Sequence, residues 1–184
     1  MKKEIKWGIL GCGGIANKFA ESTLAVDGAK VIAAASRTPG KAASFAKKHH
    51  IEKSYSDYAE LLNNKAVDAV YVATTHNFHY ENTREALLAN KPVLCEKPFT
   101  VNAQEMNALI ALAERQQVFL MEAMWTRFLP AVVQLRRWLA EDLIGSIKQI
   151  RATFGFYFPF DPDHRLFNPD LAGGALLDAG IYPL

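Results

Sequence analysis

Hydrophobic residues in the first two thirds of the chain fall into short runs, separated by longer segments with helical spacing of apolar positions. Each run is too short for a buried helix and ends in glycine, proline or polar residues, so each predicts a buried strand. The predicted strands cover residues 5–10, 30–35, 53–55, 69–73, 93–95 and 118–121. Helices are predicted between them at 15–24, 39–48, 58–62, 79–89 and 103–115, with Asp57 and Asn102 capping the third and the fifth.

Strands that alternate with helices at this spacing require a parallel sheet that is covered on both faces. Right-handed crossovers then give an α/β domain with a doubly wound sheet. The pattern changes after Met121, where an amphipathic helix is predicted at 128–141 and an aromatic-rich strand at 147–158. We place a domain boundary near residue 124 for this reason.

The second part, residues 125–184, continues with a polar loop at 161–170 and a helical segment that opens at Gly173-Gly174. One strand, one loop and the start of a helix cannot enclose a hydrophobic core of their own. The sequence therefore predicts that residues 125–184 are the incomplete start of an α+β C-terminal domain. A truncated gene product, a deliberate fragment and one half of a split protein would all account for it.

Composition narrows the class of protein. The chain has 184 residues, of which 50% are hydrophobic and 22% charged, with a net charge of +2. This balance is typical of a globular protein and gives no reason to expect nucleic acid as a partner. No segment is long and apolar enough for a membrane span or a signal peptide, and the two cysteines form no disulfide framework or metal-ligand spacing. A reduced, cytoplasmic setting without a membrane or metal is expected.

A glycine-rich turn follows the first predicted strand and opens the first predicted helix. It comprises Gly11, Cys12, Gly13, Gly14, Ile15 and Ala16. Gly11 allows a tight turn, Gly13 lets the backbone approach a pyrophosphate, and Ala16 permits close packing of helix on strand. The helix N-terminus offers amide groups to the phosphates. This strand–turn–helix context predicts a dinucleotide site in a Rossmann domain, whereas the motif alone would also suit an ordinary turn.

Residues at the end of the second strand indicate which dinucleotide is bound. NAD-specific proteins usually have an acid there, but this chain has Ser36, Arg37 and Thr38, with Lys41 one turn further on. Arg37 can hold a 2′-phosphate with two charge-assisted hydrogen bonds, and the hydroxyl groups can donate others. We therefore predict NADP as the cofactor. NAD stays possible, because the alternative is that Arg37 is a solvated loop residue and some such sites accept both cofactors.

Lys97 follows the fifth strand in the segment Glu96-Lys97-Pro98. The carboxyl ends of parallel strands line the ligand crevice, so Lys97 is expected near the nicotinamide end of the cofactor. Pro98 restricts Lys97 to extended backbone angles and allows a cis peptide bond. A lysine in this position can transfer a proton, although most lysines are simply exposed.

Three segments together resemble the glucose–fructose oxidoreductase/inositol dehydrogenase (Gfo/Idh/MocA) family. They are GCGGIA at 11–16, ATTHNFH at 73–79 and Glu96-Lys97-Pro98. Within that family, two further segments are similar to the branch of dimeric dihydrodiol dehydrogenases and NADP-dependent D-xylose dehydrogenases: MEAMWTRF at 121–128 and GGALLDAGIYP at 173–183. The resemblance implies an NADP-dependent dehydrogenase acting on the hydroxyl or carbonyl group of a sugar or cyclic diol, and a homodimer or other homo-oligomer in the full-length form.

The resemblance also implies residue roles. Lys97 matches the catalytic lysine and Tyr182 its acid/base partner. Asp178, four residues before that tyrosine, completes the implied catalytic set. Trp125 and Phe154 match residues that line the substrate pocket. The implied cofactor contacts add Thr74, His76, His79, Glu96, Lys97, Trp125 and Arg127 to the turn and to residues 36–41. Tyr182, Trp125 and Phe154 would also suit plain core packing, because aromatic residues dominate protein cores.

Two other functions fit the sequence. A non-catalytic dinucleotide-binding fragment or sensor would explain the short second part, and reduction of an imine or enone, as in biliverdin reductases of related fold, would use a similar site. Lys97, Asp178 and Tyr182 favour the dehydrogenase. Because the second part is short, we expect the 184-residue polypeptide to bind NADP but to turn over slowly.

Overall fold

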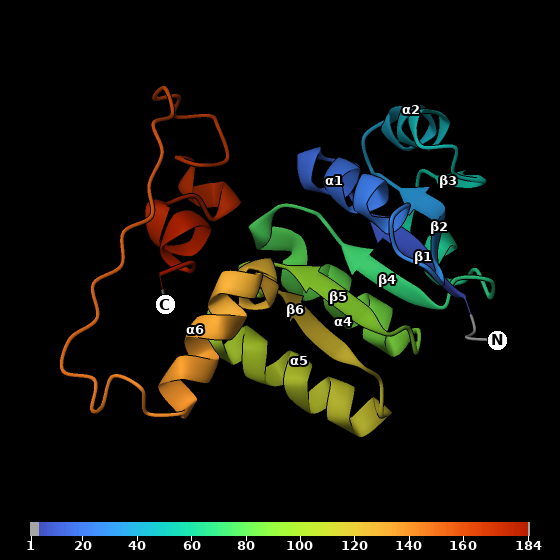
Figure 1. Cartoon of the computed structure of the whole chain (residues 1–184). Helices are drawn as coiled ribbons and strands as arrows, with labels where there is room; N and C mark the ends of the chain where they lie inside the picture. Colours follow the sequence, from blue (N-terminus) through green and yellow to red (C-terminus); the bar gives the residue numbers. More distant parts are fainter. Residues whose placement is uncertain (1–3, 184) are drawn as a thin grey trace. The chain divides into compact units, whose positions relative to one another are not determined.

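The computed structural model describes residues 4–183 and divides the chain into two compact units, Met1–Glu122 and Ala123–Leu184. The first unit contains a six-stranded sheet in the order β3-β2-β1-β4-β5-β6 (Figure 1). The strand pairs from β3 to β5 are parallel. The strands are β1 (Ile5–Leu10), β2 (Ala29–Ala35), β3 (Lys53–Tyr55), β4 (Ala69–Val72), β5 (Val93–Glu96) and β6 (Leu120–Ala123).

Helices cover both faces of this sheet, with α1 and α2 on one face and α4 and α5 on the other (Figure 1). This confirms the doubly wound α/β prediction. The helices are α1 (Gly14–Thr23), α2 (Lys41–Lys48), α3 (Tyr58–Leu62), α4 (His79–Leu88) and α5 (Ala103–Gln116), and the short 3₁₀ helix η1 (His76–Phe78) precedes α4. The order of the strands reverses at β1 and β4, which is where such a sheet opens a ligand crevice.

Local signals explain where several helices begin. The Asp57 carboxylate accepts a hydrogen bond from the Ala59 amide, and the Asn102 side chain accepts one from the Glu105 amide at 2.9 Å. Both predicted caps are therefore confirmed. Helix α2 begins two residues later than predicted, because Gly40 adopts a left-handed backbone with φ of 72° and the helix starts after it.

The core of the first unit lies where the sheet meets its helices. All four residues of β4 are buried, and Leu61, Leu87 and Leu109 bring α3, α4 and α5 onto the sheet with no exposed area. Burial of each such leucine contributes about 1.5–3 kcal/mol relative to an exposed position. This packing holds the carboxyl ends of the strands in place.

The second unit contains the 3₁₀ helix η2 (Trp125–Phe128), the helix α6 (Pro130–Ala140), the 3₁₀ helix η3 (Pro169–Leu171) and the π-helical turn η4 (Leu176–Gly180). The predicted strand at 147–158 is wrong, because residues 147–160 form no helix or strand. A strand needs a hydrogen-bonded partner, and the part of the second unit beyond β6 that the structure describes has no other strand. None of the helices within residues 4–183 is long and apolar enough to cross a membrane.

Two neighbouring residues of α5 test the packing. We expect Leu109→Ala to lower the free energy of unfolding by about 2–5 kcal/mol, because it leaves a cavity in the core. Ile110→Ala is the matched control, since 41% of Ile110 is exposed, and it should cost about 1 kcal/mol or less. Urea unfolding of both variants measures the difference, and equal losses would contradict this account of the core.

Candidate functional site

The glycine turn lies between β1 and α1. Gly11 has a φ of 90°, and a Cβ atom on it would lie 2.8 Å from the carbonyl oxygen of Ala73. Any side chain at Gly11 would thus be strained and would collide with the backbone after β4. Around Gly13 and Gly14, by contrast, no described atom outside the adjoining residues and the backbone of the same helix lies within 4 Å of an added Cβ atom. The turn is therefore closely packed at Gly11, next to the sheet, and has open space around Gly13 and Gly14.

The N-terminus of α1 leaves its amide groups available to a ligand. Gly13 occupies the capping position, and no side chain within residues 4–183 caps this helix. Asn17 supports the turn from within the helix, because its Nδ2 donates to the Gly13 carbonyl oxygen at 2.8 Å. Its Oδ1 accepts from Lys48 Nζ at 2.7 Å, which ties α1 to the end of α2. Uncapped amide groups at a helix N-terminus form an anion site.

Cys12 is an inert member of the turn. Its side chain is buried, and its Sγ donates to the Ala35 carbonyl oxygen at 3.5 Å. Burial raises the pKa of the thiol to about 11, and the positive charge of Lys41 opposes this only in part. The thiol is therefore protonated near neutral pH and is no nucleophile.

The loop after β2 carries the predicted 2′-phosphate residues. Ser36 is buried, and its Oγ accepts from the Thr38 amide at 3.2 Å, which fixes the start of the loop. Arg37, Thr38 and Lys41 are exposed. The guanidinium carbon of Arg37 lies 4.8 Å from the centre of the Tyr58 ring, at the start of α3.

A buried pair holds the end of β5. Tyr71 on β4 donates a hydrogen bond from its hydroxyl to Glu96 Oε1, and the other carboxylate oxygen accepts the Lys97 amide at 3.2 Å. The Tyr71 ring stacks on Phe19 of α1 with 3.9 Å between ring centres. Burial raises the pKa of Glu96, although the Tyr71 hydroxyl and the Lys97 amide act in the opposite direction. Glu96 thus fixes the backbone of the lysine that follows it.

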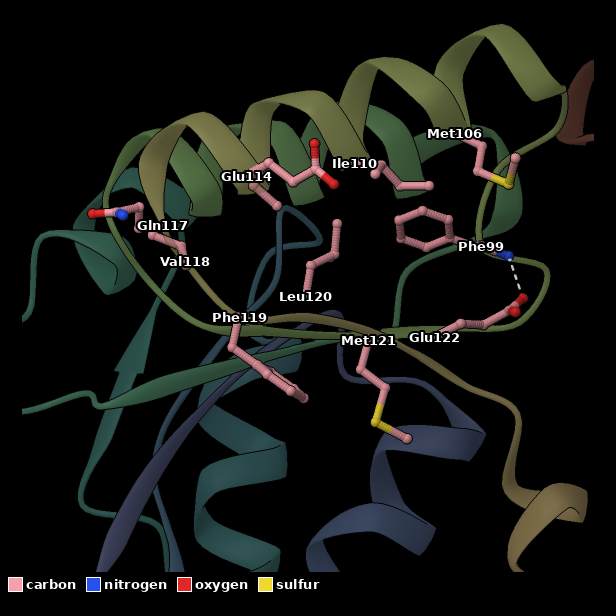
Figure 2. Close-up of a pocket in the computed structure, with 11 residues that line it drawn as sticks. Phe99, Met106, Ile110, Glu114, Gln117, Val118, Phe119, Leu120, Met121 and Glu122 are labelled. Carbon is pink, nitrogen blue, oxygen red and sulfur yellow. Dashed lines mark hydrogen bonds between the residues drawn. The ribbon is translucent and has the colours of Figure 1, made fainter.

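The peptide bond between Lys97 and Pro98 is cis, as the sequence allowed. The next amide, that of Phe99, donates to Glu122 Oε1 at 2.9 Å and so anchors the segment to β6 (Figure 2). Figure 2 also shows the side chains that line a groove between α5 and β6, among them Met106 and Ile110. The volume of this groove is about 620 Å³. Lys97 is not among its lining residues, so this groove is separate from the predicted site.

His79 joins the ends of β4 and β5. Its Nδ1 lies 2.7 Å from the carbonyl oxygen of Pro98, and its Nε2 lies 3.1 Å from that of Thr74. The side chain has no exposed area, and burial lowers its pKa, although the contacts with the Pro98 and Thr74 carbonyl oxygens act in the opposite direction. His79 therefore links the segments that follow β4 and β5, and its predicted contact with the cofactor stays a prediction. The neighbouring His76 is also buried, with its ring centre 5.7 Å from that of His79.

Three aromatic residues predicted for the site come together in the second unit. Trp125 Nε1 donates to the Tyr182 hydroxyl at 3.3 Å, and the Phe154 ring centre lies 4.7 Å from that of Tyr182. About half of the surface of Trp125 and Phe154 is exposed. Arg127 is exposed on η2.

Asp178 lies in η4 and is buried. Its Oδ1 accepts from Arg165 Nη1 at 3.2 Å, which supplies the positive charge that a buried carboxylate requires. The predicted helix through Asp178 and Tyr182 is one π-helical turn that ends at Gly180, so Tyr182 follows the turn.

Four supporting residues were not predicted from the sequence: Tyr58, Tyr71, Glu122 and Arg165. Tyr58, Tyr71 and Arg165 contact the predicted site residues Arg37, Glu96 and Asp178. Glu122 contacts Phe99, two residues after Lys97. Tyr58 and Tyr71 lie in apolar stretches that predict core residues. Arg165 in its polar loop gave no signal beyond its charge.

The residues present fit a dinucleotide. The open turn at Gly13 and the uncapped α1 suit a pyrophosphate, and the loop after β2 suits the adenosine ribose end. Among residues 4–183, no group of three or more His, Cys, Asp or Glu side chains could hold a metal ion. The fold and this turn together define a dinucleotide-binding Rossmann domain.

Comparison with known proteins gives the family. Residues 5–124 match the model "Oxidoreductase family, NAD-binding Rossmann fold", and residues 132–184 match "GFO/IDH/MocA C-terminal domain". The chain belongs to the Gfo/Idh/MocA oxidoreductase family, so the resemblance stated from its motifs is confirmed.

Similar proteins include trans-1,2-dihydrobenzene-1,2-diol dehydrogenase from Danio rerio, 42% identical over 97% of this chain and 53% of the relative. D-xylose 1-dehydrogenase (NADP(+)) from Hypocrea jecorina is 41% identical over 98% of this chain and 51% of the relative. Among solved structures, an NAD binding oxidoreductase from Klebsiella pneumoniae has a TM-score of 0.87 at 29% identity, covering 98% of this chain and 51% of that one. Another solved structure is a variant of the 3-ketoreductase KijD10 from Actinomadura kijaniata in complex with TDP-benzene and NADP. It has a TM-score of 0.84 at 34% identity and covers 98% of this chain and 55% of that one. The chain spans about half the length of these relatives.

The raised pKa of Glu96 predicts a pH dependence of stability. The folded state keeps the Glu96 proton over a range that begins near pH 4.3, where the unfolded glutamate loses it. Stability is therefore full below that pH and falls until the folded pKa is passed, by about 1.4 kcal/mol for each pKa unit between the two states. Glu96→Gln removes this titration, so its free energy of unfolding minus that of the wild type should rise across the range.

Urea unfolding from about pH 4 to about pH 8 measures this difference. Tyr71→Phe serves as the companion variant. It removes the hydroxyl that opposes the effect of burial, so the fall in stability should extend to higher pH than in the wild type. A flat difference between Glu96→Gln and the wild type would contradict the raised pKa.

Proposed function

We propose that the chain is the cofactor-binding part of an NADP-dependent dehydrogenase, which transfers a hydride between the nicotinamide and a hydroxyl or carbonyl carbon of a sugar or cyclic diol. The observation that carries the proposal is the exposed Arg37 guanidinium at the end of β2, in the position where an acid would select NAD. The exposed Lys41 adds a second positive charge at the end of the same loop, where its amide donates to the Thr38 carbonyl oxygen at 3.2 Å.

The relatives support this choice of cofactor and chemistry. One is named for NADP and D-xylose, others for a cyclic dihydrodiol, and a solved relative holds NADP. All are oxidoreductases that are similar to this chain over nearly its whole length. The match to the oxidoreductase family model is consistent with either a sugar or a cyclic diol as substrate.

NADP would be held by the glycine turn at its pyrophosphate and by residues 36–41 at its 2′-phosphate, and it would supply the hydride acceptor. Oxidation of an alcohol also releases the hydroxyl proton, which requires a base. Lys97 is our candidate for holding and passing on that proton, because Glu96 fixes its backbone at the end of β5. Tyr182 is the candidate from the second unit, with its oxygen positioned by Trp125.

The exposed faces of Trp125 and Phe154 are our candidates for contacts with substrate. Aromatic faces pack against the C–H surfaces of sugars and cyclic diols while hydroxyl groups hydrogen-bond elsewhere. We also retain as proposals a cytoplasmic location and a homo-oligomer. Apolar side chains exposed on α6, including Val133 and Trp138, support the latter.

Arg37→Ala tests the cofactor. We expect the Kd for NADPH to rise about 10- to 100-fold, because one or two charge-assisted hydrogen bonds to phosphate are lost, while the Kd for NADH changes less than about threefold. Nicotinamide fluorescence titration of the 184-residue chain measures both. Lys30→Ala at the other end of β2 is the control and should leave the ratio unchanged. If the ratio of the Kd for NADPH to the Kd for NADH is the same in Arg37→Ala as in the wild type, Arg37 does not bind the 2′-phosphate.

Lys97→Met tests the chemistry. We expect slow NADP reduction by the wild type with D-xylose or trans-1,2-dihydrobenzene-1,2-diol, and a further loss of about 10²- to 10⁴-fold in the variant, as for other acid/base groups. The Kd for NADPH should stay within about threefold, since the methionine retains a similar length of chain. Turnover by Lys97→Met at the wild-type rate would contradict the assignment. Tight NADPH binding without turnover of either substrate by the wild type would favour the non-catalytic alternative.

A further inference from the structure

Arg37 lies on an exposed loop, where a long side chain ordinarily samples many rotamers. Its charge is not neutralised by a carboxylate in any ion pair found within residues 4–183. Instead, its guanidinium carbon lies 4.8 Å from the centre of the Tyr58 ring. This distance is well within the range of a cation–π interaction, which extends to about 6 Å.

Tyr58 offers a fixed surface to the guanidinium group. It is the first residue of α3, which the Asp57 cap secures, and only 6% of its surface is exposed. Its ring belongs to the hydrophobic core together with Leu61 and Leu62. Burial raises the pKa of the Tyr58 hydroxyl, so the ring stays neutral at the pH of any cofactor-binding experiment.

The geometry of this contact suits a phosphate ligand. Contact with an uncharged ring, unlike an ion pair, places no carboxylate on the guanidinium N–H donors, which are the groups that hold phosphate in pairs. An acidic partner would occupy those same donors and would compete with the ligand. The aromatic contact also orders the arginine before the ligand arrives, which reduces the entropy lost on binding.

The same residues are close to the glycine turn. The Gly11 amide and the Cys12 thiol both donate to the carbonyl oxygen of Ala35, the last residue of β2, at 2.9 Å and 3.5 Å. The Ser36 amide donates to the Tyr55 carbonyl oxygen at 3.2 Å, three residues before Tyr58. The loop after β2, the start of α3 and the turn therefore meet at one place, next to the position that a dinucleotide ribose occupies in this fold.

We infer that Tyr58 is a specificity-determining positioning residue, which holds Arg37 ready for the 2′-phosphate of NADP and so contributes to discrimination against NAD. The inference rests on the proposed function, because it requires Arg37 to bind that phosphate. Tyr58 acts through Arg37 and makes no contact with the phosphate itself.

The experiment measures the Kd values for NADPH and NADH in the 184-residue chain and in four variants. Tyr58→Leu removes the ring and should weaken NADPH binding about three- to fivefold more than NADH binding. Tyr58→Met provides a second ringless side chain that fills the core if the leucine variant folds poorly. Tyr58→Phe keeps the ring and should retain the wild-type ratio, whereas a role of the hydroxyl alone would change it.

A double variant separates positioning from general loss of structure. In an Arg37→Ala background, Tyr58→Leu should cause no further change in the NADPH/NADH ratio, because the group that it positions is already absent. A merely structural role of Tyr58 would instead weaken both nucleotides equally in either background, and that result would overturn the inference. The failure of the proposed function is distinct, because the wild type would then show no preference for NADPH.

The free protein supplies a readout without nucleotide. Protons of the Arg37 side chain that lie over the Tyr58 ring should be shifted upfield in the NMR spectrum by the ring current. The shift should persist in Tyr58→Phe and vanish in Tyr58→Leu and Tyr58→Met. An Arg37 resonance at the same position in all of these variants would show that the contact does not form in solution, and would overturn the inference.

Discussion

The candidate site depends on how closely β1 approaches β4 at Gly11. A Cβ atom there would lie 2.8 Å from the Ala73 carbonyl oxygen, and the left-handed backbone of Gly11 excludes most other residues independently. This contact lies where the order of strands reverses, so it sets both halves of the crevice. The glycine turn and the loop after β2 lie on one side of it, and the ends of β4 and β5 lie on the other. A residue larger than glycine would displace both halves together.

Much of the first unit was predictable because its signals are local. Short apolar runs that end in turn residues gave all six strands to within a few residues, and the Asp57 and Asn102 caps are side chains that act on the next turn of the same helix. The handedness of strand–helix–strand connections then leaves few ways to arrange the sheet. The glycine turn was recognisable for the same reason, since its strand, turn and helix are contiguous.

The strand predicted at 147–158 does not form, which shows that a local sequence pattern is not sufficient to predict a strand. Phe154, Phe156 and Phe158 alternate as the residues of a half-buried strand do, but a strand forms only when a neighbour supplies its hydrogen bonds. In the described part of the second unit, these rings pack on other aromatic side chains instead. Phe154 contacts Tyr182, and Phe158 contacts His164. The alternating pattern indicates that these rings pack against other residues. It does not indicate which part of the chain they pack against.

The residues that support the site escaped prediction because they act across the fold. Tyr58, Tyr71 and Arg165 meet Arg37, Glu96 and Asp178 through contacts between distant segments, and the first two read as ordinary core residues. The type of contact differs between Asp178, which lies in a buried position, and Arg37, which is exposed. The buried Asp178 carboxylate is paired with a charge, which stabilises it where it is. Arg37 is held by a neutral ring, which orders the guanidinium without consuming its charge. If Arg37 binds the 2′-phosphate as we propose, this second kind of support has an advantage, because contact with a neutral ring leaves the guanidinium donors and charge to the ligand, whereas a carboxylate would compete for them.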